Sequence, residues 1–135
     1  MTEPYVTFPD VERLVVDLIK DRSELAGALV TVAPASGFDG TQRAVLVSRV
    51  GGAWVEDLRL DSPLVDLESY GPDKPSAHRL SLVARALVLQ LRGATYDGAT
   101  VQDVVEEDGP RWLPDYRHAA ASRYVSTTRL VIRPA

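Results

Sequence analysis

Three polar side chains near the C-terminal end have the types that hydrolytic enzymes combine. Asp115 and His118 lie three positions apart, and Ser122 follows four positions later. A carboxylate that orients an imidazole, which in turn activates a hydroxyl, is the arrangement used in nucleophilic hydrolysis. Because that arrangement depends on spatial geometry, proximity within one segment is a weak signal. The chain also lacks a Gly-x-Ser-x-Gly elbow, so a small cytosolic enzyme remains only an alternative interpretation.

A run of carboxylates, Glu106 to Asp108, is the other group with chemical potential. Adjacent residues of a strand point to opposite sides of the sheet, so these carboxylates are poor joint ligands for a hard cation. We interpret the run as a solvated edge. The chain has no cysteine and two histidines, which leaves little material for a zinc site. It also lacks a phosphate-binding loop. We expect no catalytic residue, no metal and no cofactor.

Length and composition indicate one globular domain over residues 1–135. Apolar residues make up 45% of the chain and charged residues 25%, as in ordinary globular domains. The net charge of −4 excludes a generally basic surface for binding nucleic acid. No apolar run approaches the roughly 18–20 residues needed to cross a membrane. The first residues do not have the pattern of a signal peptide, so we expect synthesis in the cytosol and no membrane partner.

The charges are distributed unequally along the chain. Residues 1–73 hold 13 acidic and 6 basic residues, whereas residues 74–135 hold 6 acidic and 9 basic residues. Copies with unlike halves could stack head to tail, and such contacts close into rings when the rotation permits. Alternatively, the two halves intermix on one folded surface and the asymmetry disappears.

Two helices are predicted from apolar residues at helical spacing. The first spans about residues 10–21, with Asp10 as its N-cap and one apolar stripe. The second begins after Ser76, its expected cap, and ends near Gly93. Its apolar face is broad enough for burial on two sides. Its polar edge carries Arg85 and Arg92.

The remaining periodic segments predict strands. Gly51 and Gly52 are interpreted as a tight turn between two of them. Strands separated by short turns, together with two helices, indicate the α+β class, with an antiparallel or mixed sheet and both helices on one face. The predicted strands cover Leu29–Val32, Arg43–Val50, Trp54–Leu60, Leu64–Tyr70, Thr100–Val105 and Arg123–Arg133.

Two loops contain candidate interface residues. The loop Ala33–Thr41 contains Phe38, and it is either simply mobile or orders when Phe38 docks on a partner. The loop Gly109–Ala121 combines aromatic residues with arginine, the composition of an interface hot spot. Its Trp112 could instead fold back to cover the end of the sheet. Together with two helix residues, the interface candidates are Phe38, Arg85, Arg92, Arg111, Trp112, Leu113, Asp115 and Tyr116.

A series of short motifs, in this order and spacing, resembles the tail terminator (tail completion) proteins of long-tailed bacteriophages. The similarity covers about Pro9 to Arg133. The motifs are the opening Phe8-Pro9-Asp10-Val11-Glu12 helix, a strand ending Arg49-Val50-Gly51-Gly52, the segment Asp61-Ser62-Pro63-Leu64-Val65-Asp66-Leu67 before Tyr70-Gly71, an Ala- and Leu-rich helix, Gly109-Pro110-Arg111-Trp112-Leu113-Pro114-Asp115, and a last strand with Arg123-Tyr124.

This resemblance implies a small α+β subunit that forms a ring, commonly of six copies, on the last ring of the tail tube. The ring stops tube growth, presents a surface to head-completion proteins and lets DNA pass through its lumen without specific binding. The implied location is the neck of the virion, reached after assembly in the host cytoplasm, and no catalysis is implied. Alternative interpretations are another neck or head-closure adaptor, a minor tail protein, or a host-encoded binding module.

Overall fold

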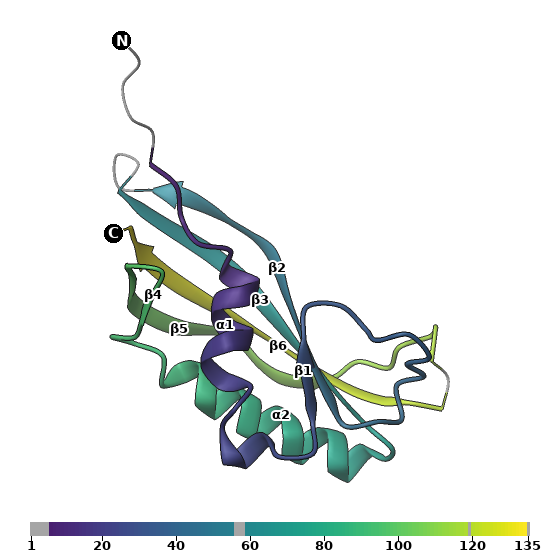
Figure 1. Cartoon of the computed structure of the whole chain (residues 1–135). Coiled ribbons are helices and arrows are strands. Elements are labelled where there is room, and N and C mark those ends of the chain that lie inside the picture. Colours follow the sequence, from purple (N-terminus) through teal and green to yellow (C-terminus); the bar gives the residue numbers. More distant parts are fainter. Residues whose placement is uncertain (1–5, 56–58, 119, 135) are drawn as a thin grey trace.

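The computed structural model describes residues 6–55, 59–118 and 120–134. These residues form two α-helices, one 3-10 turn and six strands (Figure 1). The elements, in chain order, are α1 (Val11–Ile19), η1 (Ser23–Leu25), β1 (Leu29–Thr31), β2 (Ala44–Val55), β3 (Leu60–Gly71), α2 (Lys74–Leu89), β4 (Thr95–Tyr96), β5 (Ala99–Trp112) and β6 (Ser122–Arg133).

The six strands form one mixed sheet in the order β1-β2-β3-β6-β5-β4. Strand β1 is parallel to β2, and the other neighbouring pairs are antiparallel. Figure 1 shows α1 and α2 on the same side of this sheet. The predicted α+β class, with both helices on one face, is therefore confirmed. None of the described helices is both long and apolar enough to cross a membrane.

The main core lies between the two helices and the covered face of the sheet. Alternate residues of the long strands point into it, as the period of two requires. Its largest fully buried side chains include Leu14, Val15 and Ile19 from α1, Leu80 from α2, and Val45, Val47, Val65, Leu67, Leu130 and Ile132 from the sheet. The opposite, open face of the sheet has only a small apolar cluster of Ala44, Leu46 and Tyr70.

The predicted cap is right for the first helix and wrong for the second. The Asp10 carboxylate accepts hydrogen bonds from the backbone N–H groups of Glu12 and Arg13. In α2, the Asp73 carboxylate accepts from the Ser76 N–H at 2.8 Å, so Asp73 is the cap. The helix starts earlier than predicted because proline is well suited to its first turn and needs no N–H partner there.

The predicted turn at Gly51 and Gly52 is wrong. Strand β2 continues through both glycines to Val55, with a β-bulge between Arg49 and Gly51. Gly52 has φ +90°, and a Cβ there would lie 2.1 Å from the Ser62 carbonyl oxygen, so only glycine fits.

The predicted returning strand Trp54–Leu60 is wrong as well. Trp54 belongs to β2 and Leu60 begins β3, so the two residues lie on different strands of one hairpin. Residues 56–58, which the prediction placed within that strand, lie outside the described residues.

The predicted loop Gly109–Ala121 is partly strand. Residues 109–112 are the last four residues of β5, and Trp112 pairs in register with Tyr124 of β6. Pro110 is compatible with this position because β5 has no neighbouring strand on its outer side beyond Thr100, within the described chain. Trp112 therefore has a fixed place at the end of the sheet.

Candidate functional site

Two loops that are far apart in the sequence meet at one end of the open face of the sheet. They are the segments 33–43 and 113–121, and both lie where β3 ends and β6 begins (Figure 1). Between them is a cavity of about 300 Å³, lined by Phe38, Tyr70, Asp115 and His118 among others. Three of these residues were singled out from the sequence, and the fold brings them together.

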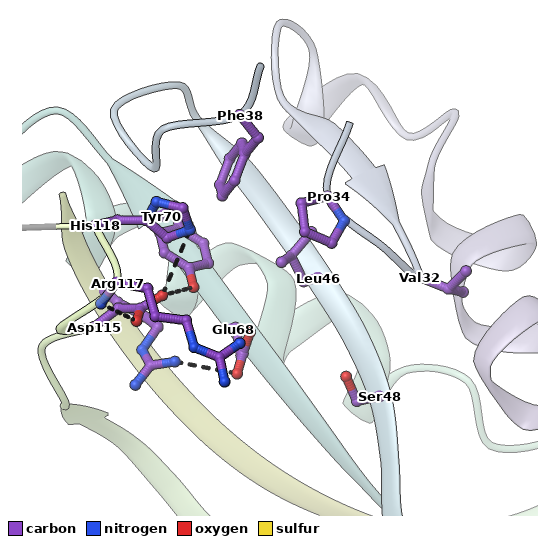
Figure 2. A pocket seen from close by; sticks show the side chains of 11 residues that line it. Val32, Pro34, Phe38, Leu46, Ser48, Glu68, Tyr70, Asp115, Arg117 and His118 are labelled. Atoms are coloured by element: carbon purple, nitrogen blue, oxygen red, sulfur yellow. Dashed lines mark hydrogen bonds and ion pairs between the residues drawn. The ribbon is translucent and has the colours of Figure 1, made fainter. Parts of the chain in front are cut away.

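Phe38 is held by aromatic contacts within its own chain. Its ring meets Tyr70 edge-on at 5.0 Å between centroids and His118 at 5.4 Å. Figure 2 shows these three rings gathered at one side of the cavity. A Cβ on nearby Gly40 would come within 2.4 Å of the Ala121 Cβ, so the two loops are in close contact. Phe38 thus packs against the sheet rather than projecting as a free docking group.

A short hydrogen bond joins the sheet to the second loop beneath these rings. The Tyr70 hydroxyl donates to Asp115 Oδ2 at 2.7 Å. Burial and this hydrogen bond raise the pKa of Tyr70 far above its ordinary value. Burial disfavours ionisation of Asp115, but the hydrogen bonds from Tyr70 and the Arg117 N–H outweigh it, so the pKa of Asp115 is lowered. Tyr70 was not predicted to be a site residue. Its one local signal is that it interrupts the alternation of apolar and polar residues along its strand.

The cavity does not assemble a hydrolytic triad. His118 Nε2 lies 3.9 Å from Asp115 Oδ2, but Ser122 begins β6 opposite Gly71 and is not among the cavity-lining residues. A general base or nucleophile needs a pKa near the working pH. The Tyr70 pKa is shifted the wrong way for either role.

The rest of the open face is a ladder of polar pairs between β3 and β6. The Arg123 guanidinium contacts Glu68 Oε1 at 3.2 Å, and Thr127 donates to Asp66 at 2.6 Å. Burial raises the pKa of Glu68, and the Arg123 charge only partly offsets this effect. These side chains are engaged with one another.

The acidic run of β5 is exposed at Glu107 and Asp108, as expected of a solvated edge, but its carboxylates are also paired with arginines. Each of its three carboxylates contacts a guanidinium within 2.7–2.9 Å, and among the described residues no cluster of three potential ligands could hold a metal ion. The partners are Arg85 for Glu106, Arg129 for Glu107 and Arg111 for Asp108. These contacts place Arg85 and Arg111, two interface candidates, in ion pairs of the subunit itself.

An exposed aromatic surface lies at the same end of the sheet, on the side of the helices. Trp112 is 39% exposed and meets the Tyr124 ring at 5.5 Å, while the Lys74 ammonium lies 5.0 Å from the Trp112 ring centroid. Tyr124 in turn stacks on His78 of α2 at 4.7 Å. We call Lys74, His78, Trp112 and Leu113 the Trp112 surface. Trp112 covers the end of the sheet with one edge and meets solvent with the other.

The structure gathers most of the predicted interface residues at one end and separates the others. Leu113 is 41% exposed next to Trp112, and Tyr116 is 96% exposed at the tip of the second loop. Arg92 lies just after the far end of α2, where its guanidinium is 3.9 Å from Asp103. Arg85 lies within α2. These two arginines are therefore not at the end of the sheet where the two loops meet.

Comparison with known proteins identifies the fold. No protein-family model matches the sequence, and no curated protein is significantly similar to it. A solved structure titled "Virion of native gene transfer agent (GTA) particle" contains a chain that superimposes with a TM-score of 0.64. The alignment covers 88% of this chain and 91% of that chain, with 12% sequence identity. The protein therefore has a fold that a virion component of a gene transfer agent also has.

Proposed function

We propose that this protein is a structural subunit of a phage-like virion, and specifically a ring-forming tail terminator. It caps the tail tube, stops tube polymerisation and presents the surface to which the head-completion protein joins. The observation that carries this proposal is the fold shared with a virion chain over nearly the whole length of both proteins. The order of motifs that resembles tail terminators gives the finer assignment.

The surface of the subunit is consistent with function through contact. Trp112, Leu113 and Tyr116 are exposed together at one end of the sheet, beside the cation Lys74. Tryptophan and tyrosine are among the residues that contribute most to the binding energy of protein interfaces. We assign the Trp112 surface to a contact with a neighbouring subunit or with the tube.

The chemistry of the cavity favours a structural role over an enzymatic one. Tyr70 keeps its proton and donates a hydrogen bond to the Asp115 carboxylate, which stabilises the loop and leaves neither group poised for proton transfer. Glu68 and Arg123, at the edge of the same cavity, are paired with each other. We propose no substrate, no metal and no cofactor.

A second candidate within the same class is another neck component, either a head-closure adaptor or a minor tail protein. Small ring-forming virion proteins share folds, so fold alone does not separate these roles. Position in the particle does separate them. Labelled protein at the junction of tail and head supports a terminator, whereas labelling along the tail or inside the head contradicts it.

The decisive experiment is to make tails with and without this protein and to measure them by negative-stain electron microscopy. We expect abnormally long or ragged tubes in its absence and no tails joined to heads. Tails of normal length that join capsids without the protein would refute the proposal.

The Trp112 surface gives the first mutational prediction. Trp112→Ala should lower tail completion at least tenfold while the purified subunit stays folded, because the indole is partly exposed and contributes little to the main core. The matched control is Val105→Ala, which removes a 43% exposed side chain from the middle of β5. Normal completion with Trp112→Ala would show that the contact lies elsewhere. An unfolded variant would show that Trp112 acts only as a cover.

A further inference from the structure

A second exposed aromatic pair lies at the opposite end of the sheet from the Trp112 surface. The rings of Phe8 and Trp54 meet edge-on, 5.2 Å apart, and Trp54 is 42% exposed. Trp54 pairs in register with Asp61 at the start of β3, whereas Trp112 pairs with Tyr124 near the start of β6. Asp61 pairs with Ile132 of β6, so the two aromatic pairs lie eight residues apart along β6 (Tyr124 to Ile132), or roughly 26 Å at about 3.3 Å per residue. One subunit thus has two distinct aromatic surfaces.

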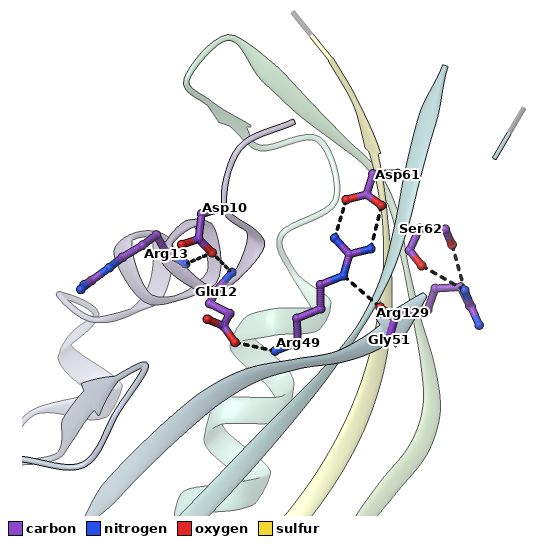
Figure 3. Close-up of polar contacts among 8 residues, drawn as sticks. All are labelled: Asp10, Glu12, Arg13, Arg49, Gly51, Asp61, Ser62 and Arg129. Carbon is purple, nitrogen blue, oxygen red and sulfur yellow. Dashed lines mark hydrogen bonds and ion pairs between the residues drawn. The ribbon is translucent and has the colours of Figure 1, made fainter. Parts of the chain in front are cut away.

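The ionic groups beneath Trp54 are engaged inside the subunit. Arg49 makes two hydrogen bonds to the buried Asp61 carboxylate, at 2.8 and 2.9 Å. The Arg49 backbone N–H donates to Glu12 of α1 at 2.8 Å, and Figure 3 shows this network between α1 and the sheet. These contacts make the base of the aromatic pair rigid and leave its charged groups little capacity to bind a partner.

A cavity of about 340 Å³ opens beside Phe8 and has one charged residue in its lining. Its walls are Thr7, Phe8, Pro9 and Ala99, and the charged residue is Asp97. Asp97 is exposed and takes part in none of the ion pairs of the described residues. The lining combines apolar groups of Phe8, Pro9 and Ala99 with polar atoms and the Asp97 carboxylate, which suits a side chain that carries a cation on an aliphatic stem. We call Phe8, Trp54 and Asp97 the Phe8 surface.

Three carboxylates, Asp10, Asp17 and Asp97, lie near Tyr96 at this end of the fold. A hydrogen bond to Asp17, burial, and the charges of Asp17, Asp97 and Asp10 raise the pKa of Tyr96 to about 12. Lys20 neutralises Asp17 from 3.2 Å away. Two further cations lie close by in the fold. The charge of Arg13 lowers the pKa of Asp17, and Arg133 is the last residue of β6 but does not line the cavity.

The Trp112 surface has the complementary chemistry. Helix α2 contains no acidic residue, and its first residue is the exposed Lys74 that lies over the Trp112 ring. Lysine has a four-carbon stem and a compact charge, which match the cavity beside Phe8. Indole and phenyl rings at both surfaces can pack edge to face once water is excluded.

We infer that the Trp112 surface of one copy docks on the Phe8 surface of the next copy, with the Lys74 ammonium against the Asp97 carboxylate. This inference rests on the proposed ring. A head-to-tail contact needs two different surfaces on each subunit, and the two ends of the sheet supply them. A two-fold dimer would instead place one surface against itself.

Cysteine cross-linking tests the contact directly, because the natural chain contains no cysteine. The variants are Thr7→Cys, His78→Cys and the double variant, which leave Lys74 and Asp97 in place, each incorporated into tails that are purified and treated with a short bis-maleimide. We expect a ladder of linked subunits, ending at the closed ring, from the double variant alone. Tails mixed from the two single variants should give linked dimers and nothing larger.

Other results overturn the inference. Dimers from a single variant indicate a two-fold contact, and correctly terminated tails of the double variant without any linked subunits place the contact elsewhere. In either case the terminator role stands, since only normal tails made without the protein refute that role. Linkage of one cysteine to a tube or head protein would assign that surface to the other partner.

A double-mutant cycle tests the ion pair without relying on the cross-link. Lys74→Gln and Asp97→Asn should each lower the fraction of correctly terminated tails several-fold, and the double variant should be no worse than either. Asparagine suits position 97 because that residue has φ +50°. Arg133→Gln, at the same end but outside the cavity lining, is the control and should have no effect. Fully additive losses would overturn the pairing.

Discussion

Tyr70 is the residue that links the sheet to the loop 113–121. Its hydroxyl is bonded to Asp115, and its ring is packed by Phe38 and His118. The sequence pointed to Phe38, Asp115 and His118 because their residue types were conspicuous in loops. It could not show that Tyr70 joins them, because that contact spans 45 positions of the chain. A tyrosine in a strand is ordinarily a core residue, and no local pattern marks its partner.

The Tyr70–Asp115 hydrogen bond predicts a pH-dependent contribution to stability. Since the pKa of Asp115 is lowered in the folded chain, its stabilisation is present above the unfolded value of about 3.9 and is lost as the pH falls through the folded value. Tyr70→Phe should therefore reduce the free energy of unfolding by about 1–2 kcal/mol at pH 7 and by much less at pH 3.

Urea unfolding at the two pH values measures this difference. Tyr116→Phe is the matched control, because that side chain is 96% exposed and loses no internal contact. An equal loss for Tyr70→Phe at both pH values would mean that the hydroxyl acts independently of the carboxylate.

At the scale of elements, periodicity predicted the helices well, but the two adjacent glycines led to the wrong prediction of a tight turn. Amphipathic spacing located α1 to within two residues at its C-terminal end, because one buried stripe requires that spacing. Gly51 and Gly52 have positive φ in the structure, as a tight turn would also require, but they directly follow a bulge at Val50 in a continuous strand. A tight turn and a bulge can be told apart only by the strand that pairs with these residues. That strand, β3, comes after the glycines in the chain, so the local sequence does not show the difference.

The last four residues of β5 were predicted to be a loop for a related reason. Pro110 is a typical loop residue, but an edge strand accepts proline where no neighbour needs its N–H. Pro110 provides no N–H at the outer edge of β5, and three register shifts in the pairing with β6 make the strand irregular. Such irregularities hinder edge-to-edge pairing with another chain, which is consistent with subunit contacts made by side chains.

The bulge gives a prediction about backbone geometry. Gly52→Ala should destabilise the subunit by about 3 kcal/mol, because a left-handed φ and a clash with the Ser62 carbonyl act together. Gly37→Ala is the control, since Gly37 has φ +78° but open space around its Cβ, and should cost about 1 kcal/mol. The two free energies of unfolding are compared in urea. Equal losses would show that the clash relaxes without cost and that only φ matters.

At the scale of the whole molecule, the sheet places β3, from the acidic half of the chain, beside β6, from the basic half. Glu68, from the acidic half, pairs with Arg123 from the basic half across neighbouring strands. The acidic run of β5 is instead paired with arginines of its own half, namely Arg85, Arg111 and Arg129. The asymmetry seen in the sequence persists mainly on α2, which has no acidic residue. This could not be predicted from composition, because it depends on which strands become neighbours.

This charge pairing predicts how the protein responds to DNA. Wild-type protein should not retain double-stranded DNA in a gel-shift assay at 100 mM salt, because Arg111, Arg123 and Arg129 are paired with carboxylates and the net charge is −4. The triple variant Glu68→Gln, Glu107→Gln, Asp108→Asn frees Arg123, Arg129 and Arg111. It should retain DNA at 50 mM salt and release it as the salt is raised, since binding then rests on phosphate contacts.

The control removes the same net charge from other places. Asp21→Asn, Asp73→Asn and Asp97→Asn together leave those three arginines paired, and asparagine still caps α2 at position 73. This variant should not retain DNA at 50 mM salt. If both triple variants bind equally, net charge alone governs the response. If the wild type binds, the sheet does not shield its arginines, and a passage that DNA must traverse freely could not be lined by this subunit.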